Sequence, residues 1–349
     1  MISVCIITKN ERDYLLKNLQ ILKNYSCEIV VVDTGSSDDS AEIAAKYADV
    51  CGYFEWCDDF AKAKNYAISL ASNDIILGLD TDEMIERLDV DYIEKKLRDN
   101  PVGLGKIKCV SSYTVEGEEQ EGIDYISRVF NRRFFHYEGR IHEQLVTDKS
   151  NEAYSFIAPI EINHLGYNQQ GDAKHKKAER NLRLLLNELE QNPDDAYIIY
   201  QIGKSYMYDD RNDEALSYFE KTFELELDSK LEWVESLIVS VGNLYIKTGQ
   251  KEKALLLESL EEDFKNSADY HFMMGYVFMQ NAQFDKAIDY FIYATKMPEG
   301  KMKGSNSYNA HYNIGVIYEC LGDEEKAAEY YKKCGNFEKA LEGISRVTK

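Results

Sequence analysis

Hydrophobic residues in the first half of the chain form short runs that alternate with helical patterns. Runs of four to six mostly apolar residues predict strands over Ser3–Thr8, Glu28–Asp33, Asp49–Phe54 and Asp74–Leu79. The spacing of apolar residues between them predicts helices over Glu11–Leu22 and Phe60–Ala71, and a third helix that ends at Tyr47 with N-caps in Ser37–Ser40. Strand–helix alternation of this kind predicts an α/β fold with a mostly parallel sheet between helical layers.

Strands dominate from Gly105 to His164, with turn signals at Glu116–Gly122 and Asp148–Glu152. After Gln169 the pattern is helical throughout and also repetitive. Each of four glycines is followed three residues later by an aromatic residue and twelve residues later by alanine: Gly203, Gly242, Gly275 and Gly315. An aromatic residue also stands four positions after the alanine in three repeats, whereas the second repeat has Glu258 there.

The helical half resembles the tetratricopeptide repeat, in which small residues let paired helices approach and aromatic residues fill the gap between them. The expected domains are therefore an α/β domain over residues 1–168, a linker helix over 169–193 and about four repeats over 194–349. A capping helix at Phe337–Ile344 would close the array.

Composition narrows the classes of partner. The chain has 349 residues and a formal net charge of −21, which disfavours nucleic acid and anionic membranes as partners. Its hydrophobic runs are too short for a transmembrane helix. The pattern of Met1–Ile7 predicts a first strand and not a signal peptide. Seven cysteines without CxxC spacing indicate reduced thiols, and so a cytoplasmic location.

The residues most informative about function directly follow the strand at Asp74–Leu79. Asp80 and Asp82 follow it directly, and two carboxylates in i and i+2 positions of an extended segment lie on the same side. In isolation, Asp-x-Asp favours a solvated acidic turn. At the carboxyl edge of a parallel sheet, where ligands of open α/β sheets bind, the pair can hold a divalent cation together with substrate phosphates.

Three other segments reach the same edge: Thr8–Glu11, Asp33–Asp38 and Phe60–Asn65. With Leu79–Glu83 they resemble the family 2 glycosyltransferases of the GT-A fold over roughly residues 1–165. The resemblance implies a nucleotide-sugar donor, usually a UDP-sugar, with Mn²⁺ or Mg²⁺ as cofactor and inversion at the anomeric carbon.

The resemblance also implies roles for single residues on the donor side. Thr8 and Asp33 correspond to positions that hold the base and ribose, while Asn10 shapes the first loop beside them. Lys64 stands where relatives often carry arginine, so it supplies charge without a bidentate fork. Asp80 resembles a contact to ribose or metal, and Asp82 the direct metal ligand. Arg128 is a candidate contact of the diphosphate.

A second cluster, Tyr137–Leu145 followed by Ile162–Tyr167, resembles the acceptor side of the same enzymes. Glu143 is the candidate base that takes the proton of the acceptor. A surface carboxylate is the alternative for Glu143. His142 and His164 are candidates to complete the metal shell or to contact the diphosphate, or else structural histidines.

The leading hypothesis is therefore a cytoplasmic, metal-dependent glycosyltransferase of the hexosyltransferase class, whose repeats recruit a peptide or protein acceptor. Similar fused enzymes modify bacterial peptides or surface proteins on serine, threonine or cysteine, and the sequence does not decide among these atoms. The alternatives are a transferase acting on a cell-envelope or lipid-linked glycan, and a non-catalytic repeat scaffold. Repeat arrays often self-associate, so a homodimer is also expected.

Overall fold

The computed structural model describes residues 1–115, 118–149, 152–165 and 171–348. The chain divides into two compact units, Met1–Gly171 and Asp172–Lys349. Each unit has its own buried hydrophobic clusters, which share no residue with those of the other. The two units are therefore described separately.

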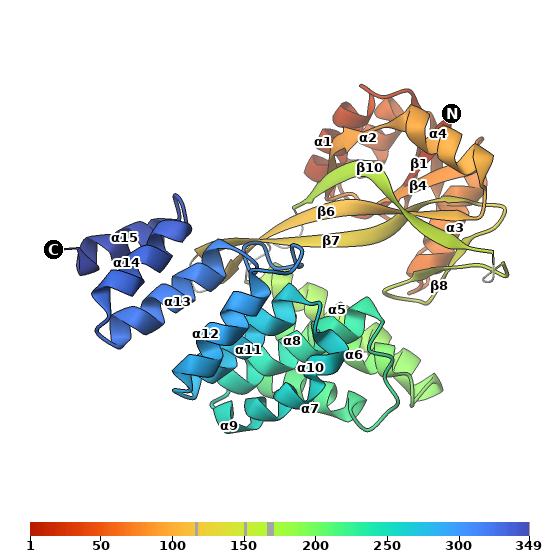
Figure 1. The fold of residues 1–349 in the computed structure, drawn as a ribbon. Helices are drawn as coiled ribbons and strands as arrows, with labels where there is room; N and C mark the ends of the chain where they lie inside the picture. Colours follow the sequence, from red (N-terminus) through yellow and green to blue (C-terminus); the bar gives the residue numbers. More distant parts are fainter. Residues whose placement is uncertain (116–117, 150–151, 166–170, 349) are drawn as a thin grey trace. The chain divides into compact units, whose positions relative to one another are not determined.

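The first unit is built on an eight-stranded sheet in the order β3-β2-β1-β4-β7-β6-β10-β5, with a separate two-stranded ribbon of β8 and β9 (Figure 1). Its strands are β1 (Ile2–Thr8), β2 (Cys27–Asp33), β3 (Val50–Tyr53), β4 (Ile75–Leu79), β5 (Glu83–Leu88), β6 (Gly103–Val115), β7 (Glu118–Asn131), β8 (His136–Glu138), β9 (Gln144–Val146) and β10 (Tyr154–His164). Its helices are α1 (Arg12–Leu22), α2 (Ser40–Tyr47), α3 (Phe60–Leu70) and α4 (Val90–Asp99).

The sheet is mixed, and its first four strands along the chain pair in parallel. Strands β3, β2, β1 and β4 are parallel neighbours, whereas β7 pairs antiparallel with both β4 and β6. The prediction of an α/β domain with a mostly parallel sheet is confirmed. Two local expectations differ: β5 was not anticipated, and residues 118–122 belong to β7 instead of a turn.

Alternate residues of β1 show why the sheet has two covered faces. Val4 and Ile6 belong to one buried cluster together with Leu15 and Leu19 of α1. Cys5, between them, belongs to a second cluster with apolar residues of α3. Because side chains alternate along a strand, burial of both sets requires a helical layer on each face. The carboxyl ends of β1, β2 and β4 are thereby held at one edge.

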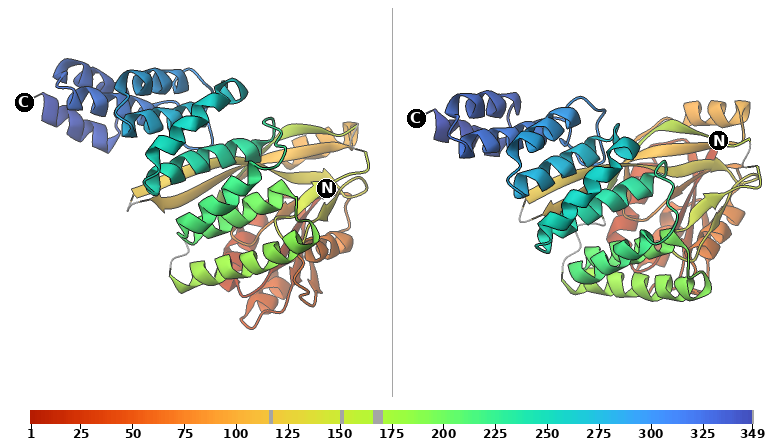
Figure 2. Two further views of the ribbon diagram at one scale, coloured as in Figure 1. Left: turned by 90° about the horizontal axis from the view of Figure 1, so that it is seen from below. Right: turned by 60° about the horizontal axis from the view of Figure 1, so that its bottom comes forward.

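The second unit is entirely helical in the part that the structure describes. Its elements are α5 (Asp172–Gln191), α6 (Ala196–Tyr208), α7 (Asn212–Thr222), α8 (Glu232–Lys247), α9 (Lys251–Ala254), the 3₁₀ helix η2 (Leu255–Leu260), α10 (Glu261–Phe264), α11 (Ala268–Gln280), α12 (Phe284–Ala294), α13 (Tyr308–Cys320), α14 (Glu324–Lys333) and α15 (Glu338–Val347). They stack in chain order, from green α5 to blue α15 (Figure 2). Helix α5 packs against α6, and α15 packs against α14.

The repeated glycines let the two helices of a pair come close. A Cβ atom at Gly203, Gly275 or Gly315 would lie 2.4–2.8 Å from the ring of Phe219, Phe291 or Tyr331, respectively. In the second repeat, the helix after Gly242 is interrupted by η2, and the atom facing that glycine is Sδ of Met273. The exceptional Glu258 of the sequence pattern lies in this interrupted segment.

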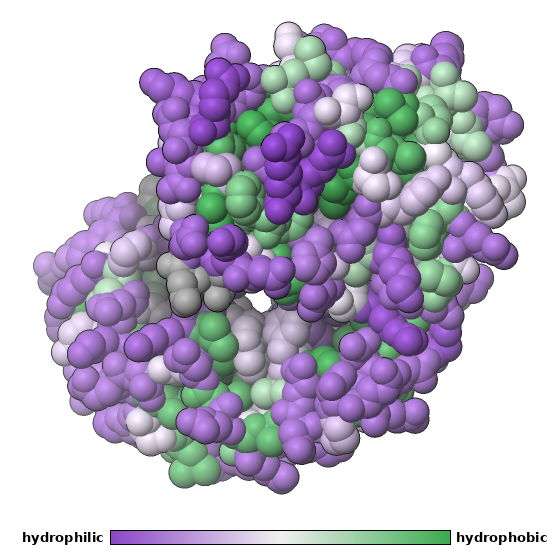
Figure 3. Space-filling model, turned by 90° about the vertical axis from the view of Figure 1, so that its right-hand side faces the viewer, coloured by the Kyte–Doolittle hydropathy of each residue, from purple (hydrophilic) through white to green (hydrophobic). Residues whose placement is uncertain are grey.

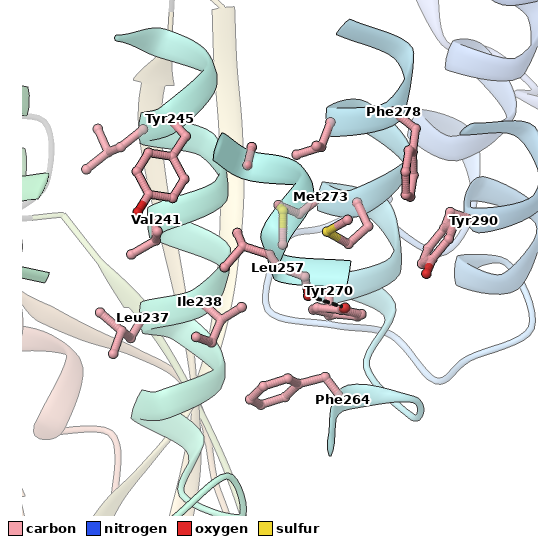
Figure 4. Close-up of a cluster of buried hydrophobic side chains, with 14 of the residues drawn as sticks. Leu237, Ile238, Val241, Tyr245, Leu257, Phe264, Tyr270, Met273, Phe278 and Tyr290 are labelled. Atoms are coloured by element: carbon pink, nitrogen blue, oxygen red, sulfur yellow. Dashed lines mark hydrogen bonds between the residues drawn. The ribbon is translucent and has the colours of Figure 1, made fainter. Parts of the chain in front are cut away.

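The core between α8 and α12 combines aliphatic and aromatic side chains (Figure 4). Leu237, Ile238 and Val241 of α8 belong to this buried cluster, and Tyr270 of α11 donates a hydrogen bond from its hydroxyl to the carbonyl of Leu257 at 2.8 Å. The buried hydroxyl is satisfied, which removes the cost of placing it in an apolar core.

Hydrophilic residues cover most of the face drawn in Figure 3, with hydrophobic residues interspersed among them. Within the described residues, every helix is too short or too polar to span a bilayer.

Candidate functional site

The carboxyl ends of β1 and β2 place two buried polar residues side by side. Thr8 and Asp33 are partners in the parallel register of these strands. One oxygen of Asp33 accepts hydrogen bonds from the backbone N–H groups of Gly35 and Ser36, both at 2.9 Å. Its other oxygen and Oγ1 of Thr8 are buried and have no hydrogen-bond partner within the described part of the chain. Buried polar atoms of this kind are normally satisfied, so the pair is suited to a polar ligand.

Asn10 fastens the loop after β1 to the loop after β2. Its backbone adopts a left-handed conformation with φ 55°, which asparagine tolerates better than most residues. Its side-chain oxygen accepts the N–H of Ser37 at 2.7 Å, and its own N–H donates to Oγ of Ser36 at 2.9 Å. The described contacts of Asn10 therefore shape the rim beside Thr8 and Asp33.

Asp80, directly after β4, lies between two cationic side chains from other elements. One oxygen is 2.8 Å from Nζ of Lys64 on α3, and the other is 2.6 Å from Nη2 of Arg128 on β7. Burial alone would raise the pKa of Asp80, but Arg128 and Lys64 outweigh it and hold this pKa well below its usual range. Asp80 is therefore ionised.

Lys64 also contacts the acceptor-side cluster. Its ammonium lies 2.6 Å from Oε1 of Glu143, and its side chain is only 9% exposed. Burial works to lower the pKa of Lys64, yet Asp80 and Glu143 together raise it. One ammonium thus joins the predicted donor-side carboxylate to the predicted base.

The β8–β9 ribbon that carries Glu143 is held against α3. The side-chain amide of Asn65 donates to the carbonyl of Tyr137 at 2.8 Å and accepts the Tyr137 N–H at 3.0 Å. The N–H of Phe60 donates to the carbonyl of Arg140 at 2.8 Å. These bonds fix the position of Glu143 relative to Lys64.

Asp82 contacts a histidine from the far end of the sheet. Nε2 of His164, the last residue of β10, lies 3.3 Å from Oδ2 of Asp82, and the N–H of Leu165 donates to the Asp82 carbonyl at 3.0 Å. Burial works to lower the pKa of His164, but the hydrogen bond and charge of Asp82 raise it. A carboxylate and an imidazole are both ordinary ligands of divalent cations.

The third predicted metal ligand, His142, lies in the turn between β8 and β9 with φ 51°. In the described ranges, Asp82, His142 and His164 do not gather into a cluster whose ligand atoms all lie within 4.8 Å of one another. Asp82 and His164 are thus the pair that the structure brings together. Two protein ligands suffice where substrate phosphates supply others.

Sequence reasoning missed two buried residues that shape this edge. Glu83 accepts the N–H of Asp80 at 2.9 Å and contacts Nη2 of Arg128 at 2.6 Å. Burial raises its pKa. The side-chain amide of Asn18 reaches the carbonyls of Thr81 and Glu83, at 3.3 and 2.9 Å. A signal for Asn18 was present, because it interrupts the apolar face formed by Leu15, Leu19 and Leu22.

Comparison with known proteins assigns the first unit. Residues 3–149 match the description "Glycosyl transferase family 2", and residues 308–334 match the tetratricopeptide repeat. The first unit is a family 2 glycosyltransferase domain. Its matched range contains every predicted site residue except His164, which lies on β10. The second unit is a tetratricopeptide-repeat region, and the matched segment corresponds to α13 and α14.

Two curated relatives extend this assignment over both units. The SPbeta prophage-derived glycosyltransferase SunS of Bacillus subtilis is 24% identical over 290 residues, which cover 80% of this chain and 67% of SunS. A TPR repeat-containing protein of Synechococcus elongatus is 31% identical over 216 residues, covering 58% of this chain and 51% of that protein. The chain, whose first unit matches family 2, is thus distantly similar to SunS.

Two solved structures are similar to part of this chain. YrrB, a TPR protein with an unusual peptide-binding site, matches 50% of this chain and 86% of its own at 23% identity, with a TM-score of 0.41. MamA matches 52% of this chain and 97% of its own at 22% identity, with a TM-score of 0.40.

Proposed function

We propose that the protein is a metal-dependent, inverting glycosyltransferase that moves a hexose from a nucleotide sugar, UDP-sugar in the simplest case, to a peptide or protein acceptor. The observation that carries the proposal is the convergence of Asp80, Asp82, Lys64, Arg128 and Glu143 at one edge of a family 2 domain.

The charge of this edge supports the need for a cation. The edge carries two cationic side chains, Lys64 and Arg128, and four carboxyl groups, those of Asp80, Asp82, Glu83 and Glu143. A nucleoside diphosphate is itself anionic, and like charges disfavour binding. Mn²⁺ held by Asp82 and His164 fits this donor set better than Mg²⁺, which prefers an all-oxygen shell, and the bound cation would supply Lewis-acid stabilisation of the departing diphosphate.

Each remaining side chain has a task set by its chemistry. The unsatisfied oxygens of Thr8 and Asp33 suit the base and ribose, which offer N–H and hydroxyl donors. Arg128 and Lys64 place positive charge where the leaving group gains negative charge. Glu143 accepts the acceptor's proton as the new glycosidic bond forms and the sugar–phosphate bond breaks.

Glu143 is a carboxylate whose Oε1 lies 2.6 Å from the ammonium of Lys64. A thiol acceptor, with an ordinary pKa near 8.5, demands less of such a base than a hydroxyl does. Acceptor atom and acceptor class are therefore the first variables to test, with peptides that differ only in Ser, Thr or Cys.

The repeat region supports a polypeptide acceptor, because stacked helical repeats provide extended surfaces suited to a segment of chain. Transfer to a lipid-linked glycan in place of a peptide would show the envelope alternative to be right.

The first experiment measures donor binding by calorimetry, with UDP-glucose and UDP-N-acetylglucosamine, with Mn²⁺ or with chelator. Asp82→Asn removes a ligand charge without changing shape, so metal-dependent affinity should fall at least tenfold. Asp39→Asn is the matched control, because Asp39 is an exposed carboxylate paired with Arg12 away from this cluster. Equal affinity in Asp82→Asn would remove the metal role, and no turnover of any sugar nucleotide would favour a scaffold.

A further inference from the structure

Outside the transferase domain, three potential metal ligands gather where α5 meets the end of α6. His175 and Glu179 stand one turn apart on α5, and Asp209 caps the carboxyl end of α6. One ligand atom from each lies within 4.8 Å of the others. Among the described residues, this is the one cluster of three or more histidine, cysteine or carboxylate side chains with that geometry.

The imidazole is already aimed at the carboxylate. Nδ1 of His175 lies 3.1 and 3.0 Å from the two oxygens of Asp209. The Asp209 side chain is 9% exposed, although it contacts a histidine that is 60% exposed. The cluster is therefore open to solvent on the α5 side and anchored on the α6 side.

Two adjacent acids at this helix end create a local demand for positive charge. The carboxyl end of a helix carries partial negative charge, so Asp209 and Asp210 are unfavourable there without a cation. Asp210 has one, because Nζ of Lys174 lies 2.5 Å from its carboxylate. The carboxylate of Asp209 contacts His175, whose imidazole can serve as a hydrogen-bond donor or as a metal ligand.

We propose that His175, Glu179 and Asp209 bind a divalent transition-metal ion of the zinc class. One imidazole and two carboxylates provide three ligands whose two negative charges match the ion, and water completes the shell. Zinc–ligand distances of about 2.0–2.2 Å require ligand atoms closer together than 4.8 Å, which a rotamer change of the Glu179 side chain can supply. Mg²⁺ and Ca²⁺ prefer all-oxygen shells, so the imidazole disfavours them.

Arg211 competes for one of the ligands. Its Nη1 lies 3.3 Å from Glu179, while its guanidinium also contacts Glu214 at 2.9 Å. Glu214 can keep Arg211 when Glu179 turns to the ion. Removing the arginine charge should therefore tighten metal binding, whereas a purely ionic cluster would only lose a contact.

A metal ion at this position would tie the first helix of the repeat region to the corner between α6 and α7. Binding of this ion would not depend on sugar transfer, because its ligands are separate from those at the sheet edge.

The test uses the full chain carrying Asp82→Asn, so that the proposed transferase metal contributes little. Zn²⁺ binding is measured by calorimetry, and Co²⁺ binding by the paramagnetic shifts of imidazole proton resonances, which report whether a histidine contacts the ion. We expect one ion per chain, at least tenfold weaker binding in His175→Ala and Asp209→Asn, and severalfold tighter binding in Arg211→Gln. Millimolar Mg²⁺ should not displace the ion.

His136→Ala is the matched control, since His136 contacts Glu138 at 3.0 Å in an exposed pair without a third ligand. Its zinc affinity should equal that of the parent. The proposal is overturned if His175→Ala binds zinc as tightly as the parent with unchanged circular dichroism, or if Co²⁺ leaves the His175 imidazole resonances unshifted. In those cases His175 and Asp209 form an ion pair and nothing more.

Discussion

At the scale of single residues, the site depends on carboxylates that have different partners. Asp80 is fixed by two cations, Asp82 contacts His164, and Glu143 contacts the ammonium of Lys64. These differences give chemically similar groups separate roles, since a carboxylate held by two cations is a poor base. Glu143, with one cationic contact given by the structure, is the better candidate to accept a proton.

Glu143→Gln should retain donor affinity and lose transfer by about 10²- to 10⁴-fold, the usual contribution of a general base. Glutamine keeps the shape and the contact to Lys64 but accepts no proton. Initial rates of transfer, compared with donor affinity from calorimetry, measure the two effects separately.

The control for this variant is Glu138→Gln, an exposed carboxylate on the same β8–β9 ribbon that contacts His136. It should transfer at the parent rate. If Glu143→Gln also does so, the base is another group.

At the scale of elements, the repeat helices depend on glycines that lie against aromatic rings. A Cβ at Gly275 would sit 2.8 Å from ring atoms of Phe291, which is closer than packed atoms tolerate. Helix pairing in this region is therefore controlled by a size match between one small and one large residue.

Gly275→Val should lower the free energy of unfolding by about 1–3 kcal/mol, because overpacking displaces the Phe291 ring. Chemical denaturation followed by circular dichroism measures the loss. In the Phe291→Leu background, Gly275→Val should lower the free energy of unfolding by less. A coupling free energy of about 0.5 kcal/mol or more between the two substitutions identifies the contact. Strictly additive effects would mean that the glycine serves another purpose.

Much of this element-level structure could be predicted from sequence. The first strands and helices follow local apolar patterns, and four glycine-centred repeats share the same offsets. Strand β5 was missed because Glu83, Glu86 and Arg87 make it look like a solvated turn, although Glu83 is buried against Arg128. That burial depends on a partner 45 residues away, and no local pattern encodes it.

The site, too, could be predicted only in part from the sequence. Segments after β1, β2 and β4 were expected at one edge because parallel strands end together. The contact of Lys64 with both Asp80 and Glu143 was not expected from the sequence. It depends on the position of the β8–β9 ribbon, which is set by the hydrogen bonds of Asn65 and Phe60.

At the scale of the whole molecule, the two units have separate hydrophobic cores that share no residue. The transferase residues all belong to the first unit. Recruitment of a polypeptide, as proposed, would belong to the second.

Removal of residues 172–349 should therefore leave metal-dependent hydrolysis of the sugar nucleotide intact and reduce transfer to a full-length protein acceptor at least tenfold. Release of free nucleoside diphosphate and mass spectrometry of the acceptor measure the two activities. A short peptide containing only the modified residue is the control, since its modification should change little. Undiminished transfer to the full-length acceptor would contradict recruitment by the repeats.

The shared ammonium of Lys64 has a consequence for how variants are interpreted. Because Asp80 and Glu143 draw on the same positive charge, loss of either one leaves Lys64 more strongly attracted to the other. The energetic effects of substitutions at these two positions will therefore not sum, and a rate measured for one variant describes the coupled trio of side chains. In the proposed function, the donor-side carboxylate and the acceptor-side base would therefore be coupled electrostatically through one lysine.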